Sequence, residues 1–164
     1  MSMILYLRRA DAVEALASAS EEDFADFIFD EIAGSAGDLI HFDKAWHALH
    51  FVFAGSEAAT GTSLGLLMNE WPEFGVDGGY GAPRLAPPAA VKAFADALAG
   101  LSDEELKSRY DPAAMERADV YIADMLVEDG LEDGWGYVAQ GLPALRAFIK
   151  KCVEHNSSVI LYLS

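Results

Sequence analysis

The two ends of this 164-residue chain carry the same tetrapeptide, Ile-Leu-Tyr-Leu, inside apolar segments at residues 3–7 and 159–163. Both segments are continuous runs of apolar residues rich in β-formers. A strand that is covered on one face alternates apolar and polar side chains, whereas a strand covered on both faces does not. The sequence therefore predicts that the chain ends meet as neighbouring interior strands of one sheet.

Between the two ends, apolar side chains mostly repeat at helical spacing. The capping sequence at residues 20–23 predicts a helix whose apolar face continues from Phe24 through Ile32. A second helix is predicted from Asp43, as its N-terminal cap, to Gly55, in the left-handed position that ends many helices. Further elements are predicted as a short strand at residues 79–85 and as helices that begin at residues 87–88, 102–105 and 111–112, followed by a last helix around residues 145–153.

This order of elements defines the predicted fold class, which is α+β. We expect a single domain over residues 1–164, in which a small mixed β-sheet contains both chain termini and is wrapped by several helices. A chain of this length can bury roughly 70% of the surface that its unfolded form exposes. Hydrophobic residues make up 52% of the chain and charged residues 23%, a composition that excludes a disordered protein.

Three features predict a cytoplasmic protein that makes no membrane contact. No apolar run approaches the roughly 18 residues that span a bilayer. The first positive charges follow a very short apolar stretch, which is the wrong order and length for a secretory signal. Cys152 is the single cysteine, so no disulfide can form inside the chain, as is usual for a reducing compartment.

The chain is strongly acidic, with 27 Asp and Glu residues against 11 Lys and Arg and a formal net charge of −16. Nucleic acids are bound by cationic surfaces, so we expect no nucleic-acid partner. The acidity either serves solubility or complements a basic protein partner. The segment at residues 128–134 is interpreted as a solvated acidic turn, and its candidate partner-binding residues are Glu128, Asp129, Glu132 and Asp133.

A histidine lies within the apolar stripe of the predicted helix at residues 43–55. Trp46, His50 and Phe53 share one face of that helix, so we predict that His50 is buried and hydrogen-bonded. His47 and His50 are three residues apart without the intervening glutamate of a helical zinc motif. We therefore predict a structural role for His50, no metal site and no cofactor.

A second candidate site combines residues of this helix with a glycine-dense segment at residues 75–81. That segment lacks the ending of a phosphate-binding loop and is interpreted as a tight turn or bulge. Cys152 falls on an apolar helix face, where a thiol is usually inert. The predicted ligand pocket lies near Trp46, His50, Asp77 and Tyr80, with His50 as its acid–base group if the protein is an enzyme.

Several motifs together resemble those of one bacterial family. They are the opening Met-Ser-Met-Ile, the Asp-Lys-x-Trp-x-x-Leu-His pattern at residues 43–50 with Gly55 after it, the Gly-Tyr-Gly at residues 79–81 followed by Pro87, the segment from Arg109 to Met115, and the terminal Val-Ile-Leu-Tyr-Leu. In this order they resemble the YfbM-like family, a domain of unknown function. The resemblance runs over nearly the whole chain and implies a single bacterial α+β domain.

The family brings no established activity, so two function hypotheses remain open. The first is a non-catalytic cytoplasmic binding protein, such as an acidic immunity-type inhibitor of a basic toxin or nuclease. The alternative is a small enzyme or small-molecule binder that uses the pocket near Trp46, His50, Asp77 and Tyr80. The distribution of the acidic residues and the grouping of these four side chains discriminate the two hypotheses.

Overall fold

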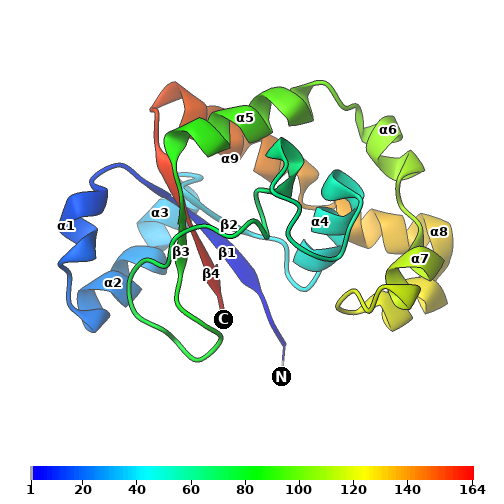
Figure 1. Cartoon of the computed structure of the whole chain (residues 1–164), viewed down its shortest axis with the longest axis horizontal. Helices are drawn as coiled ribbons and strands as arrows, with labels where there is room; N and C mark the ends of the chain where they lie inside the picture. The colour runs from blue at the N-terminus through cyan, green and yellow to red at the C-terminus, as the bar shows by residue number, and fades with distance from the viewer. Residues whose placement is uncertain (1) are drawn as a thin grey trace.

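In the computed structural model, which describes residues 2–164, the first and last strands form the centre of a four-stranded sheet (Figure 1). β1 (Leu5–Ala10) pairs with β4 (Ser158–Leu163) over their full lengths. β2 (Leu39–His41) flanks β1, and β3 (Arg84–Ala86) flanks β4. The prediction that the chain ends are neighbouring interior strands is confirmed. Every pairing among the described strands is antiparallel, so the sheet is not the mixed sheet that we expected.

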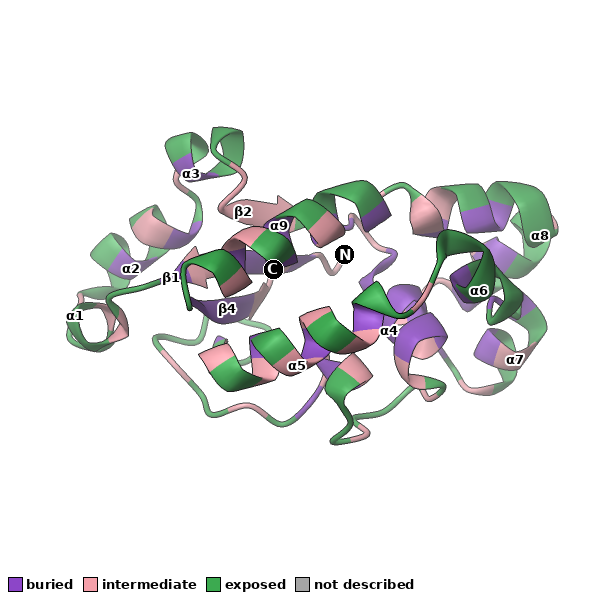
Figure 2. Ribbon diagram, turned by 90° about the horizontal axis from the view of Figure 1, so that it is seen from above, coloured by how far each residue is buried: buried purple, intermediate pink, exposed green. Residues whose placement is uncertain are grey.

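The remaining elements are helices, which confirms the α+β class. Their bounds in residues 2–164 are α1 (Val13–Ala17), α2 (Glu21–Ile28), α3 (Glu31–Ser35), α4 (Trp46–Ala54), the 3-10 helix η1 (Ser63–Gly65), α5 (Pro88–Ala99), α6 (Asp103–Ser108), α7 (Pro112–Arg117), α8 (Ala123–Ala139) and α9 (Leu142–Glu154). Helices α1–α3 lie at one end of the molecule and α6–α8 at the opposite end (Figures 1 and 2). None of the helices in these residues is long and apolar enough to cross a membrane.

The sheet separates two apolar cores, because successive side chains of a strand point to opposite faces. On one face, Leu7 and Leu161 join the larger core, to which α4, α5, α8 and α9 contribute buried side chains. On the other face, Ile160 packs with Phe24 and Ile28 of α2 in a smaller core. Purple, buried stretches mark the sides of α4 and α8 that face this interior (Figure 2). Burial on both faces explains the apolar runs at residues 5–7 and 159–163, although β1 begins later than predicted and continues through Arg8 and Arg9 to Ala10.

The helix predicted from residue 20 through Ile32 is two helices in the structure. Ser20 caps α2 as predicted, but α2 ends at Ile28. Asp30 then starts α3, because its carboxylate accepts a hydrogen bond of 2.9 Å from the backbone N–H of Ile32. Such a local bond competes with continuation of the preceding helix. Ile32 consequently lies 78% exposed and does not belong to the predicted buried stripe.

The strand predicted at residues 79–85 is reduced to β3, while the segment before it is a loop. Gly79 and Gly81 have φ values of +113° and +97°, which a strand does not use. The Asp77 carboxylate holds this conformation, since Oδ1 accepts hydrogen bonds from the N–H groups of Gly79 at 2.7 Å and Gly81 at 3.1 Å. The glycine-dense segment, interpreted as a tight turn or bulge, is therefore a longer loop between Glu73 and Arg84, with local turns that Asp77 holds at Gly79 and Gly81.

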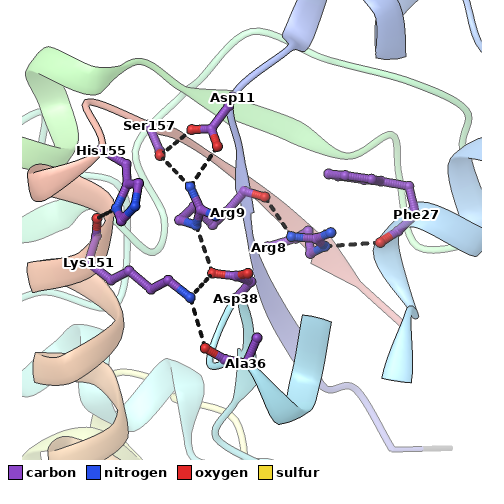
Figure 3. A network of polar contacts seen from close by, with 9 residues as sticks. All are labelled: Arg8, Arg9, Asp11, Phe27, Ala36, Asp38, Lys151, His155 and Ser157. Atoms are coloured by element: carbon purple, nitrogen blue, oxygen red, sulfur yellow. Dashed lines mark hydrogen bonds and ion pairs between the residues drawn. The ribbon is translucent and has the colours of Figure 1, made fainter. Parts of the chain in front are cut away.

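A network of hydrogen bonds and ion pairs connects the sheet to α9 (Figure 3). Arg9 of β1 donates from Nε to Asp38 Oδ1 at 2.7 Å, and Lys151 Nζ of α9 lies 2.6 Å from the same oxygen. The Arg9 guanidinium also contacts Asp11 at 2.6 Å and Ser157 at 3.1 Å, and the Ser157 hydroxyl donates to Asp11. One guanidinium thus joins β1 to the residues that precede β2 and β4.

We expect Asp38→Asn to weaken the fold in a pH-dependent way. The hydrogen bond from Arg9, aided by Lys151, holds the pKa of Asp38 at about 2, below its usual 3.8, in a side chain that is 15% exposed. The ionised carboxylate therefore stabilises the folded state above about pH 4, and this contribution disappears as the pH falls towards 2. The variant should lose about 2 kcal/mol of unfolding free energy at pH 7, measured by urea denaturation.

The control for this prediction is Asp96→Asn, because the ion pair between Asp96 and Lys92 is mostly exposed at the surface. Exposed pairs contribute little, so the control should change stability by less than about 1 kcal/mol. The difference between the parent and Asp38→Asn should shrink as the pH is lowered from 7 to 3. A difference that stays constant over this range contradicts the stabilising role of the ionised carboxylate.

Candidate functional site

A cavity of about 240 Å³ lies beside the end of the sheet where β4 finishes. β1 and β4 contribute Leu5, Leu161 and Leu163 to its lining, on the sheet face that also carries the larger core. The other walls come from the first residue of α4, from the segment after η1 and from the chain that leads into and begins β3. Their lining residues are Trp46, Leu67, Met68, Asn69, Trp71, Glu73, Tyr80, Gly81, Ala82 and Arg84.

Backbone hydrogen bonds hold two tryptophans in this lining. The indole Nε1 of Trp46 donates to the carbonyl of Met3 at 3.0 Å, and Nε1 of Trp71 donates to the carbonyl of Leu66 at 2.8 Å. Asn69 is fixed in a similar way, because its amide bonds the backbone of Gly61 and Thr62. The tryptophan N–H groups are therefore used inside the protein, and the rings offer apolar surface to the cavity.

The rim of the cavity carries two side chains of opposite charge. Glu73 and Arg84 face each other in an antiparallel bridge. Two backbone hydrogen bonds flank this bridge, one from Phe74 N–H to the Pro83 carbonyl at 2.6 Å and one from Leu85 N–H to the Pro72 carbonyl at 2.9 Å. Facing residues of an antiparallel pair project to the same side. Both charges consequently lie at one place on the cavity rim.

The structure brings two of the four predicted pocket residues together and separates the other two from them. Trp46 and Tyr80 line the same cavity. Asp77 is exposed in the glycine loop, where it bonds the loop backbone and borders a different depression of about 60 Å³ beside Tyr162. His50 is fully buried within α4 and does not belong to the lining of either hollow.

The predicted burial and hydrogen bond of His50 are confirmed. Its Nε2 lies 2.8 Å from the carbonyl of Ala58, so the ring carries its proton on Nε2. Burial lowers the pKa of His50 below its usual value of 6.5, which keeps the ring neutral at pH 7. Within residues 2–164, its Nδ1 has no hydrogen-bond partner. The buried ring fixes the loop after α4.

The other candidate nucleophiles and metal ligands are spread through the fold. Cys152 is buried as predicted, and burial raises the pKa of its thiol to about 12, so it is protonated at neutral pH. His47 uses both ring nitrogens on the backbone, with Nδ1 accepting from Tyr121 N–H at 3.0 Å and Nε2 donating to the Glu57 carbonyl at 2.8 Å. In the described part of the chain, no three His, Cys, Asp or Glu side chains gather as a metal ion requires.

The prediction that Asp43 caps the helix of Trp46 is wrong, although Gly55 ends that helix in the left-handed conformation as predicted. Asp43 itself has a φ of +51° and lies three residues before the start of α4. Its Oδ2 accepts a hydrogen bond of 2.6 Å from the hydroxyl of Tyr137, which belongs to α8. Burial, together with this bond, raises the pKa of Tyr137 to about 12. Asp43 therefore positions α8 against the segment that leads into α4.

The four acidic candidates all lie exposed on α8. The segment at residues 128–134 thus belongs to α8, and the acidic turn that we expected there is a break between two helical pieces of that element. The helix bends at Gly130, whose φ of 76° and ψ of −169° suit glycine and not other residues. Leu131 follows this bend and is 62% exposed, with Val127 also exposed before it. The carboxylates around this apolar pair belong to Glu128, Asp129, Glu132 and Asp133.

Negative charge is concentrated in two segments of the chain. Residues 103–139, which contain α6–α8, hold eleven of the 27 acidic residues and three of the 11 basic ones. Residues 11–31, which contain α1 and α2, hold eight acidic residues and no basic one. These two segments lie at opposite ends of the molecule (Figure 1). An ion pair of 3.0 Å between Lys107 and Glu132 neutralises part of the first segment.

Comparison with known proteins identifies the family. The chain belongs to a family described as a domain of unknown function, DUF1877, whose sequence profile matches residues 1–162. Among solved structures, it is similar to YfbM from Escherichia coli, a protein of unknown function, with 16% sequence identity and a TM-score of 0.64. The match covers 97% of this chain and 98% of that one, and at this identity it shows the fold. No curated protein matches the chain.

Sequence reasoning missed the charged pair on the cavity rim. Glu73 and Arg84 stand on either side of the glycine-dense loop, and neither belongs to a periodic pattern or a known motif. A signal was present in Pro72 and Pro83, since prolines next to both residues favour extended backbone on each side of a turn. This symmetry indicates a short hairpin, but it does not show that the hairpin borders a cavity.

We expect His50→Ala to lower the unfolding free energy by about 1–3 kcal/mol, because the Ala58 carbonyl loses its partner inside the protein. The pKa of His50 is lower in the folded chain than in the unfolded one. The unfolded chain therefore binds a proton first, and the stabilisation by neutral His50 is lost as the pH falls below about 6.5. Urea denaturation at pH 8 and pH 5.5 measures both effects.

His155→Ala is the matched control for this prediction, since His155 is exposed at the end of α9. The control should cost less than about 1 kcal/mol, because the hydrogen bond from its ring to the Lys151 carbonyl is exposed to water. The cost of His50→Ala should be larger at pH 8 than at pH 5.5. Stoichiometric zinc in the purified protein that disappears in His50→Ala contradicts the structural role of this histidine.

Proposed function

We propose that this chain is a bacterial, cytoplasmic binding protein that engages a basic protein through the exposed acidic part of α8. An immunity-type inhibitor that covers a basic toxin or nuclease is the form of this function that we favour. The observation that carries the proposal is the exposed Leu131 at the bend of α8, with carboxylates before and after it.

Such a surface combines the two features that a charged protein partner needs. An exposed apolar side chain provides area that a partner can bury, and polar residues around it form the rim of an interface. Carboxylates on the rim speed association with a cationic partner and select its orientation. The bend at Gly130 contributes by presenting Leu131 outward from the helix.

We expect neutralisation of these carboxylates to abolish capture of the partner. The test variant carries Glu128→Gln, Asp129→Asn, Glu132→Gln and Asp133→Asn. The parent, immobilised and exposed to native bacterial cytoplasm at low salt, should retain a basic protein that the variant does not retain. Retention should fall as salt rises from about 0.05 to 0.5 M, because the Debye length shortens from roughly 14 Å to about 4 Å.

A charge-matched control separates a specific surface from general acidity. Its substitutions are Glu14→Gln, Glu21→Gln, Glu22→Gln and Asp26→Asn, which remove four exposed carboxylates at the opposite end of the molecule. The control should retain the same basic protein as the parent. If both variants retain the same proteins as the parent, or if the parent retains none, the acidic surface of α8 is not a binding site.

A small-molecule site in the 240 Å³ cavity is the second candidate function. The observation that favours it is that Trp46 and Tyr80, which are far apart in the sequence, line one hollow together with Trp71. Aromatic walls with a few polar groups are typical of ligand pockets. His50 lies outside this lining, so we propose binding and not acid–base catalysis at the cavity.

A further inference from the structure

The cavity rim has an unusual charge arrangement on one face of the sheet. Arg84 pairs with Leu161 in the β3–β4 register and faces Glu73 on its other side. Side chains that are opposite one another across neighbouring strands share a face. One row of side chains on this face therefore contains Leu161, Arg84 and Glu73, in that order. Leu161 belongs to the apolar lining of the cavity, Arg84 is the cation and Glu73 is the anion.

The two charges of this row lie apart from the ion pairs found among residues 2–164. Within residues 2–164, neither the Arg84 guanidinium nor the Glu73 carboxylate takes part in an ion pair. The polar atoms deeper in the lining are already used, since both indole N–H groups and the Asn69 amide bond the backbone. A ligand would therefore meet mostly apolar surface inside the cavity, together with the ring of Tyr80, and one charge of each sign at the rim.

We propose that the cavity binds a small zwitterion with an apolar side chain, such as a free amino acid. The proposal rests on the second candidate function above and names its ligand class. The carboxylate of the ligand pairs with Arg84, its ammonium group pairs with Glu73, and its side chain enters between Trp46 and Trp71. A cavity of 240 Å³ lies just below the usual range of ligand pockets, which suits a ligand of this size.

The paired charges explain why a zwitterion fits better than a singly charged molecule. A lone cation that approaches Glu73 is repelled by Arg84 beside it, and a lone anion that approaches Arg84 is repelled by Glu73. A ligand with both charges in the matching order gains two attractions at short range, which exceed the two repulsions at longer range. Guanidinium also has the planar fork that binds carboxylates bidentately, which gives the site an orientation as well as a charge.

The experiment is calorimetric titration of the full chain with matched probes. L-phenylalanine and L-leucine carry both charges, 3-phenylpropanoate lacks the ammonium group, and 2-phenylethylamine lacks the carboxylate. We expect one or both amino acids to bind, and L-phenylalanine to bind at least tenfold more tightly than either of its two analogues. Trp71→Phe should keep this binding, whereas Trp71→Ala should weaken it.

Charge variants test the assigned pairs. Arg84→Gln should lower the affinity for L-phenylalanine at least tenfold and leave the affinity for 2-phenylethylamine unchanged or higher. Glu73→Gln should also lower the affinity for L-phenylalanine at least tenfold, but it should leave the affinity for 3-phenylpropanoate unchanged or higher. Lys92→Gln and Glu70→Gln change the net charge equally at exposed positions outside the lining and should leave the affinities unchanged. Thermal unfolding of each variant verifies that it folds.

The outcomes distinguish this inference from the candidate function on which it rests. If an analogue with one charge binds as tightly as L-phenylalanine and the charge variants change nothing, the cavity is a ligand site but the zwitterion assignment is wrong. If none of the four probes binds to the parent, the assignment and small-molecule binding at the cavity are both overturned.

Discussion

The pairing of the first strand with the last is the interaction on which the rest of this structure depends. β1 and β4 form the centre of the sheet, so each edge strand pairs with one of them, β2 with β1 and β3 with β4. Their side chains divide the apolar residues into the larger core and the smaller core under α2. The same two strands provide Leu5, Leu161 and Leu163 to the cavity. Arg9, at the far end of β1, connects this sheet to α9.

The sequence predicted those features that depend on local patterns. The terminal strands followed from continuous apolar runs, and the caps at Ser102 and Asp111 followed from side chains that bond the first turn of their own helix. Asp43 was mispredicted because its carboxylate prefers Tyr137, a partner on α8 that no local pattern reveals. For the same reason, only Trp46 and Tyr80 of the four predicted pocket residues line the cavity. Its aromatic residues stand out in the sequence, but which of them meet is decided by tertiary packing.

The two candidate functions use separate parts of the molecule. The acidic surface belongs to α8, at the end of the molecule that α6 and α7 also form. The cavity belongs to the sheet, to the start of α4 and to the segment after η1. α4 contacts both parts, since it packs against α8 and contributes Trp46 to the cavity. The cavity lining and the four carboxylates of α8 share no residue, so the two functions can be tested with separate substitutions.

The central claim is that β1 and β4 form the most stable unit of the fold, and amide hydrogen exchange tests it most directly. Exchange from the most protected amides of a domain requires global unfolding, whereas peripheral elements open locally at lower free energy. The account predicts that the hydrogen-bonded amides of β1 and β4 exchange last, at the free energy of global unfolding, and that those of α1 to α3 exchange earlier. Exchange of the β1 and β4 amides at the rate of α1 to α3, while α5 and α9 stay protected, would contradict it.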